Sequence, residues 1–134
     1  WSSDVCSSDL QTFDIREHER GERMFVQGND DGYSTPIEGI RQKTLAYGAR
    51  TLMTEFRLEG GRVLPLHQHP YEQTGYLVRG RLRLTVGQEQ HDTRPGDSWC
   101  IPPDVIHGAE VLEDSVAIEV FSPVREDYLP RGNR

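Results

Sequence analysis

Residues 60–80 read GGRVLPLHQHPYEQTGYLVRG and carry His67 and His69 one residue apart. The stretch predicts a β-strand, and because side chains of a strand alternate between its two faces, both imidazoles should point the same way. A third histidine, His107, follows the turn-forming residues 102–104. Two imidazoles from one strand and a third from another can enclose a divalent metal ion and leave positions open for a ligand. The sequence therefore predicts a metal site.

Short strand-like runs follow one another through the rest of the chain. The expected strands span residues 41–47, 51–58, 63–69, 74–78, 81–86, 90–94, 98–101, 107–112 and 115–121. Residues 79–80 and 113–114 are interpreted as turns between strands. No segment shows a sustained helical period of apolar residues, and no repeat stands out. Many short strands with frequent turns predict an all-β sandwich or barrel.

The ends of the chain look different from its middle. The first ten residues, WSSDVCSSDL, resemble the in-frame translation of a sequencing adapter and are excluded from fold reasoning, although a genuine Ser/Asp-rich tail is the alternative. Residues 11–40 are expected to form a polar leader or N-terminal arm, in which Met24 is a possible true start. Residues 41–124 are assigned to one folded domain and residues 125–134 to a C-terminal tail.

Composition and charge exclude several classes of protein. The 134-residue chain is acidic, with a net charge of -7 and a mean hydropathy of -0.68. Without a basic patch or zinc-finger spacing, no nucleic-acid partner is expected. The sequence contains no apolar run of 18 residues, so no membrane partner is expected. Apart from Cys6 in the excluded segment, Cys100 is the single cysteine, which precludes an intrachain disulfide and favours the cytoplasm.

The residue pattern of the predicted strand at 115–121 indicates self-association. Val116, Ile118 and Val120 form an apolar face, while Glu119 and Phe121 lie on the opposite face. If Glu119 faces a cavity, the apolar face must be covered by another sheet or another subunit. A homodimer is therefore expected, and the modest size of the domain favours it.

The first histidine pair belongs to a spaced motif. Gly61, His67, His69, Gln73 and Gly80 have the spacing of the first cupin motif. The sequence carries glutamine where that motif has glutamate.

A second spaced motif follows it. Gly96, Pro102 and His107 resemble the second cupin motif, with Asp104 at its usual glycine and Val111 at its usual asparagine. Both motifs in order, with strand patterns between them, resemble the cupin family more specifically than either motif alone.

The resemblance covers residues 41–124 and implies a double-stranded β-helix, the RmlC-like jelly-roll barrel, with a metal in its mouth. His67, His69, His107 and Gln73 would hold one divalent transition metal: Zn, Ni, Mn, Fe or Co. A neutral amide leaves the ion its full charge, which suits a Lewis acid and an anionic substrate better than oxygen chemistry. The alternative is that Gln73 only forms a hydrogen bond nearby and water completes the metal site.

The stretch from Glu119 to Leu129 resembles a narrower group, the small bacterial cupins of pectin and alginate degradation. Those proteins convert 4,5-unsaturated uronate monosaccharides into linear keto forms, using an acidic residue, an aromatic residue and an arginine. The three map onto Glu119, Phe121 and Arg125. Glu119 departs from the aspartate of that group, and its extra methylene moves the carboxylate by about one bond length.

Each charged candidate has a structural alternative. Arg125 can hold a substrate carboxylate by a bidentate fork, or form a surface ion pair with Glu126 or Asp127. Glu119 can move protons during ring opening and tautomerisation, or form a buried ion pair with an inward arginine.

Aromatic residues are expected to shape the pocket. Phe121, Tyr76 and Trp99 can wall a site of sugar size, with Phe121 and Tyr76 as substrate-binding residues. The alternative is that they are core residues, since aromatics in strands usually pack.

The predicted function is that of a metal-dependent isomerase or ring-opening enzyme for a small carboxylated sugar. One alternative is a metal-dependent dioxygenase at the same site. The other is a non-catalytic cupin that binds or senses a small molecule. The fold alone does not distinguish them, because function depends on the site.

Overall fold

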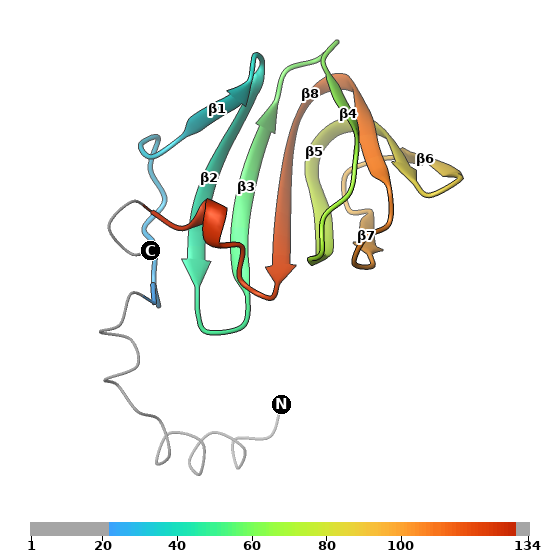
Figure 1. Ribbon diagram of the computed structural model, residues 1–134. Helices are drawn as coiled ribbons and strands as arrows, with labels where there is room; N and C mark the ends of the chain where they lie inside the picture. The colour runs from blue at the N-terminus through green and yellow to red at the C-terminus, as the bar shows by residue number, and fades with distance from the viewer. Residues whose placement is uncertain (1–21, 131–134) are drawn as a thin grey trace, which may run out of the picture.

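The computed structural model describes residues 22–130, so the predictions for residues 1–10, for 11–21 of the leader and for 131–134 of the tail lie outside the described residues (Figure 1). The strands are β1 (Ser34–Ile37), β2 (Ile40–Tyr47), β3 (Leu52–Leu58), β4 (Val63–His67), β5 (Glu72–Val86), β6 (Glu89–Thr93), β7 (Ser98–Ile101) and β8 (His107–Ser122). The 3₁₀ helix η2 (Glu126–Tyr128) follows them, and no helix of the described chain is long and apolar enough to cross a membrane.

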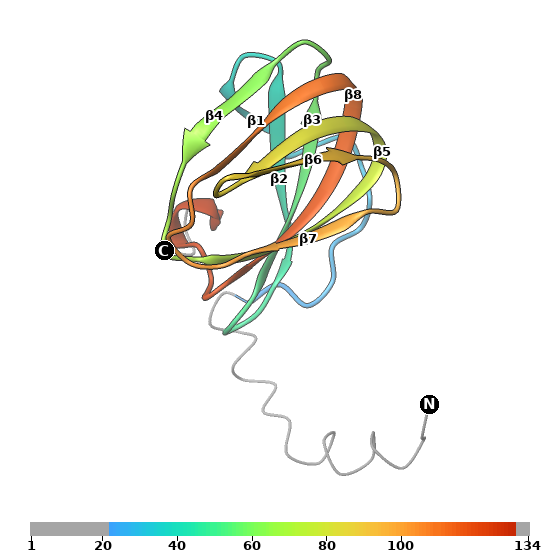
Figure 2. The same ribbon diagram turned by 90° about the vertical axis from the view of Figure 1, so that its right-hand side faces the viewer.

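The long strands β5 and β8, of 15 and 16 residues, pair with each other along both halves of the fold. Residues 115–121 of β8 also pair with β3, which β2 and β1 extend, while β7 pairs with the first part of β5. Residues 107–110 of β8 pair with β4, and β6 pairs with the last part of β5. The two halves curve around one interior (Figure 2). The predicted all-β jelly-roll barrel is confirmed.

Both predicted turns inside the long strands are wrong. Residues 79–80 and 113–114 lie within β5 and β8, where the register shifts between paired residues. Gly80 has a φ of +97°, and a Cβ added there would collide with Ser115 on β8. Glycine at such an irregularity permits a sharp bend and a close backbone approach. These turn formers therefore mark the corner at which the strands pass from one half of the barrel to the other.

The core lies between the two halves and leaves a cavity open at one end. One buried cluster contains Ile40, Leu58, Leu77, Leu82, Val111 and Ala117. A second, nearer the C-terminal segment, contains Tyr47, Leu52 and Phe121. Burial of each large apolar side chain contributes about 1.5–3 kcal/mol. β1, which lies in the segment expected to be an irregular arm, adds Pro36 and Ile37 to the cavity lining.

Candidate metal centre and active site

The structure brings the three predicted histidines together at the open end of the barrel. His67 is the last residue of β4, and His107, the first residue of β8, pairs with it in the sheet. His69 lies beyond β4, in the connection to β5, so the expectation that both imidazoles project from one strand is corrected. The potential ligand atoms of the three residues lie within 4.8 Å of one another. The group can therefore hold a metal ion.

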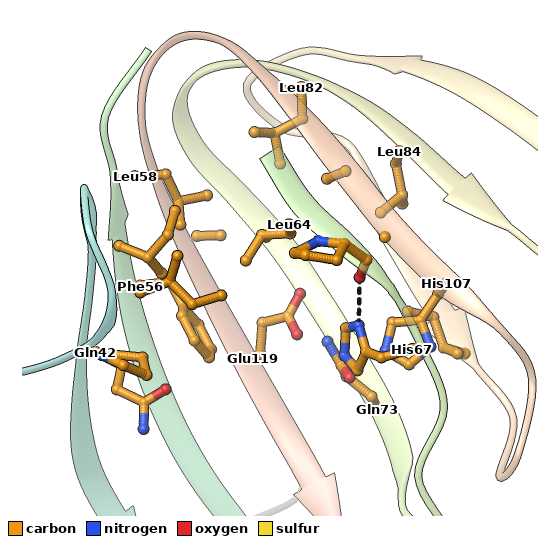
Figure 3. Close-up of a pocket in the computed structure, with 18 of the residues that line it drawn as sticks. Gln42, Phe56, Leu58, Leu64, His67, Gln73, Leu82, Leu84, His107 and Glu119 are labelled. Atoms are coloured by element: carbon orange, nitrogen blue, oxygen red, sulfur yellow. Dashed lines mark hydrogen bonds between the residues drawn. The ribbon is translucent and has the colours of Figure 1, made fainter. Parts of the chain in front are cut away.

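A backbone carbonyl group contacts Nδ1 of each imidazole. Each Nδ1 lies within 3.1 Å of a carbonyl oxygen two residues away: His67 with Pro65, His69 with Tyr71, and His107 with Val105. The dashed line in Figure 3 marks the bond of His67. Because a carbonyl oxygen only accepts hydrogen bonds, Nδ1 of His67 and of His107 carries the proton, and Nε2 of each keeps its lone pair. His69 has a second acceptor, Gln73 Oε1, beside its Nε2, so its proton can lie on either ring nitrogen. Two Nε2 atoms are thus prepared as ligands.

The surroundings of the Nε2 atoms also fit a cation. His107 Nε2 is buried and has no hydrogen-bond partner among the described residues. Burial lowers the pKa of His107 and of His69, which favours the neutral, ligating form. His69 Nε2 lies at a hydrogen-bond distance of 2.9 Å from Gln73 Oε1, so the amide oxygen is beside the ring nitrogen that would bind a metal ion. Three imidazoles and an amide oxygen suit a divalent transition metal.

A cavity of about 460 Å³ extends from the histidines into the barrel. This volume is within the range of sites that bind small molecules. Its wall is mostly apolar, and the lining residues with polar side-chain groups are Gln42, His67, Gln73, Trp99, His107, Glu119, Arg125 and Tyr128. In Figure 3 the carboxyl group of Glu119 points into the cavity, toward the side on which Gln73 and His67 lie.

Glu119 is buried in the inner face of β8. Trp99 Nε1 donates a hydrogen bond of 2.9 Å to Glu119 Oε1. Burial raises the pKa of Glu119 to about 8, and the hydrogen bond from Trp99 opposes that shift. The alternative of an ion pair with an inward arginine is wrong, because the partner of this carboxyl group in the described chain is the Trp99 indole.

Arg125 lies just after β8, and its side chain is held at the edge of the cavity. Its guanidinium carbon lies 3.9 Å from the ring centre of Tyr128, 5.0 Å from that of Phe121 and 5.1 Å from that of Tyr71. Its Nε and Nη2 donate to the carboxylate of Asp127 at 3.2 and 2.8 Å. The ion-pair alternative is therefore present, and cation–π contacts fix the same guanidinium beside the cavity.

The predicted aromatic wall is only partly present. Phe121 and Trp99 line the cavity, and Phe121, at 1% exposure, is also a core residue. The structure does not bring Tyr76 to the cavity: the ring is 49% exposed on the outer face of β5. Gln73 and Gly75 face inward on that strand, so Tyr76, of opposite parity, must face outward.

Three contributions to the site were not anticipated from the sequence. Gln42 on β2 reaches the cavity wall, and Trp99 bonds to Glu119 from a strand 20 residues earlier in the chain. Gly75 on β5 lies between Trp99 on β7 and Glu119 on β8. Gln42 is two residues from the buried Ile40 on β2 and therefore lies on the same, inward face, which was the one local signal that pointed to it.

The barrel and its histidine cluster define the class of protein: the chain belongs to the cupin family. The family model for the cupin domain (Cupin_2) matches residues 54–122.

Within that family, the chain is similar to proteins named for pectin degradation. It is 28% identical over 94 residues to the pectin degradation protein KdgF of Dickeya dadantii, covering 69% of this chain and 86% of the relative. The structure of KdgF from Halomonas sp. superposes with a TM-score of 0.74 at 31% identity, covering 79% of this chain and 97% of that one. An RmlC-like cupin from Shewanella frigidimarina has a TM-score of 0.74 at 27% identity, covering 78% and 95%.

Proposed function

We propose that this protein is a metal-dependent cupin enzyme that converts 4,5-unsaturated uronate monosaccharides into their linear keto forms. The observation that carries the proposal is that His67 and His107 of the histidine cluster line the same cavity as the buried carboxyl group of Glu119. The similarity to proteins named KdgF supports the substrate class. We place the activity in the cytoplasm, where the unpaired, exposed thiol of Cys100 stays reduced.

Four neutral donors would hold the metal: Nε2 of His67, His69 and His107, and Oε1 of Gln73. A divalent ion bound there supplies Lewis-acid stabilisation of negative charge on a substrate oxygen. The hydrogen bonds from Nδ1 keep the imidazoles oriented for this role. Gln73 lies on the inner face of β5, buried, with its amide oxygen already beside His69.

Arg125 would bind the carboxylate of the substrate. A guanidinium group has five N–H donors, and Asp127 accepts bonds from Nε and Nη2, which leaves donors for a second carboxylate. Contacts with the rings of Tyr71, Phe121 and Tyr128 hold the group in place before substrate arrives. A positioned cation of this kind lowers the entropic cost of orienting the substrate.

Glu119 would move the proton. The conversion is an isomerisation in which the anomeric hydroxyl loses its proton, the bond between carbon 1 and the ring oxygen breaks, and the former ring oxygen gains a proton, so that an aldehyde and an enol form. The enol becomes a ketone when carbon 4 gains a proton and the enol oxygen loses one, so no co-reactant is consumed. A carboxyl group with a pKa of about 8 can accept and return protons near neutral pH. A bound cation favours its ionised form.

The proposal is tested by turnover of unsaturated uronates by purified protein loaded separately with Zn, Ni, Mn, Fe or Co. The expected result is loss of the ultraviolet absorbance of the double bond with at least one metal, and none after chelation. Absence of turnover by protein with metal demonstrably bound would contradict it. Oxygen uptake that requires ferrous iron would favour the dioxygenase, and uronate binding without turnover would favour the sensing cupin.

We also propose that the enzyme is a homodimer joined through the outer face of β8 and its neighbours. Val116, Ile118 and Val120 are only partly buried there, and Met53 and Tyr76 beside them are 39% and 49% exposed. A contiguous apolar surface of this kind is typical of an association site. Sedimentation velocity of the full chain tests the proposal, which predicts a dimer; a monomer at micromolar concentration would contradict it.

A further inference from the structure

A row of paired residues crosses the barrel at the level of Glu119. Thr54 on β3 pairs with Glu119 on β8, Glu119 pairs with Gly75 on β5, and Gly75 pairs with Trp99 on β7. Trp99 therefore lies two strands from Glu119, with backbones about 10 Å apart. The indole Nε1 is nevertheless 2.9 Å from Glu119 Oε1. The side chain of Trp99 must reach across β5 to make this bond.

Gly75 makes that reach possible. A Cβ added at Gly75 would overlap the six-membered and five-membered rings of Trp99, with Cε2, Nε1 and Cζ2 as its nearest atoms. Gly75 is not among the glycines with positive φ, so its role here is space and not an unusual backbone conformation. Any other residue at this position would displace the indole from the bond with Glu119.

Thr54 is the cross-strand neighbour of Glu119 on the other side, on β3. Its side chain is fully buried, and Oγ1 has no hydrogen-bond partner among the described residues. The buried acid thus has an indole donor from β7, and its neighbour on β3 carries a buried hydroxyl without a partner in the described part of the chain. Glu119 Oε1 is committed to Trp99, while the carboxyl group as a whole points into the cavity toward Gln73 and His67 (Figure 3).

We propose that Trp99, lying across Gly75, is the positioning residue that holds the carboxyl group of Glu119 toward the histidine cluster. The inference rests on the proposed function for its catalytic consequence. Glutamate has one more rotatable bond than aspartate, so its carboxyl group has more rotamers to lose when it is fixed. The indole bond selects one of them, which allows the longer acid to act at a defined place in the cavity.

The first test measures the bond itself, without substrate. The chain has two tryptophans, Trp1 and Trp99, and Trp1→Phe identifies the indole N–H resonance of Trp99 by NMR. We expect that proton to exchange slowly with solvent in the Trp1→Phe protein. Exchange should also be slow when Glu119→Gln is added to Trp1→Phe, because glutamine keeps an acceptor oxygen. Glu119→Ala should speed exchange about tenfold or more, as expected for loss of a buried hydrogen bond. Equal exchange in all three proteins would overturn the inference.

The second test measures the consequence of the bond between Trp99 and Glu119 for turnover by the metal-loaded enzyme. Trp99→Phe keeps a ring but removes the donor, and we expect kcat to fall about ten- to a hundredfold while KM and metal affinity stay within about threefold. Gly75→Ala should reproduce this loss. Gly48→Ala is the matched control, because no atom lies within 4 Å of a Cβ at Gly48 and its φ is not positive.

The two proposals fail in different ways. If uronates are not turned over but the indole proton is protected by Glu119, the proposed reaction is wrong and the positioning bond stands. If uronates are turned over and Trp99→Phe leaves kcat unchanged, the positioning role is wrong and the reaction stands. A fall in metal affinity parallel to kcat would assign Trp99 a merely structural role and would also overturn the inference.

Discussion

The two faces of β8 both depart from the usual arrangement of an antiparallel strand. Its inner face buries Glu119 between Ala117 and Phe121, whereas its outer face leaves Ile118 and Val120 partly exposed. In a sheet with one wet side, apolar residues normally face the core and charged residues face water. The inner acid is the residue that the proposed reaction needs, and the outer apolar residues are those that the proposed dimer would cover.

The largest effect is expected from replacing Glu119, the acid on the inner face of β8. We expect Glu119→Gln to lower turnover of unsaturated uronates by about 10²- to 10⁴-fold, the range of general acid–base catalysis, while metal remains bound. The free energy of unfolding should rise at neutral pH, because a buried ionisable group is replaced by a neutral one. Glu110→Gln is the control, since that exposed residue of β8 pairs with Arg83 at the surface. Unchanged turnover in Glu119→Gln would remove the acid from the reaction.

The inner face also begins with His107, one of the proposed metal ligands, so His107→Ala should affect metal loading. We expect metal affinity to fall about a hundredfold, because one of three imidazoles is lost. Competitive titration with a chromophoric chelator measures the change. His91→Ala is the control: that histidine is exposed and contacts Glu89, away from the cluster. Equal loss in both variants would mean that the cluster is not the metal site.

The pH dependence of stability sharpens the comparison in the protein without metal. Glu119 ionises near 4.5 when unfolded and near 8 when folded, so between these values the folded state holds more protons. The free energy of unfolding should therefore fall as pH rises through this window, by at most about 1.4 kcal/mol per pH unit. The lowered pKa values of His69 and His107 act oppositely near pH 6.5, where unfolding is favoured as pH falls.

The free energy of unfolding is measured against pH for the wild type and for Glu119→Gln. Subtracting the second curve from the first isolates the contribution of the Glu119 carboxyl group, because both proteins keep the histidines. Chemical denaturation at several pH values gives both curves. A difference that is flat from pH 5 to pH 8 would show that burial does not perturb Glu119.

The smallest effect on the chain itself is expected on the outer face. Ile118→Lys should dissociate the proposed dimer while changing the stability of the single chain by within about 0.5 kcal/mol, as for a surface substitution. Sedimentation velocity and thermal unfolding measure the two quantities. Leu112→Lys, on the other half of β8 and 39% exposed, is the control and should not alter association. A dimer that survives Ile118→Lys would place the interface elsewhere.

Local patterns were sufficient to predict the barrel and the histidine cluster. Motif spacing constrains the backbone around His67 and His69, and strand parity identifies the buried residues. The second motif survives its substitution at Asp104, which has a φ of +65° where glycine is usual. Aspartate is one of the few other residues that adopt this left-handed conformation readily. The turn before His107 was therefore recognisable despite the change.

Contacts that depend on register between distant strands could not be predicted in the same way. The bond from Trp99 to Glu119 requires the pairing of β7, β5 and β8, which no local pattern encodes. The continuity of β5 and β8 was missed because Gly80 resembles a turn residue until its partner strand is known. Tyr76 was misplaced for a simpler reason, since its parity relative to Gln73 already directed it outward.

The imidazoles of this protein take their orientation from the main chain, not from neighbouring acids. The acceptors are the carbonyl oxygens of Pro65, Tyr71 and Val105, which every amino acid at those positions would also supply. Side-chain substitution there leaves the acceptor in place as long as the chain follows the same path. The ligand geometry is consequently robust to drift in neighbouring side chains and vulnerable to insertions or deletions that alter the loop.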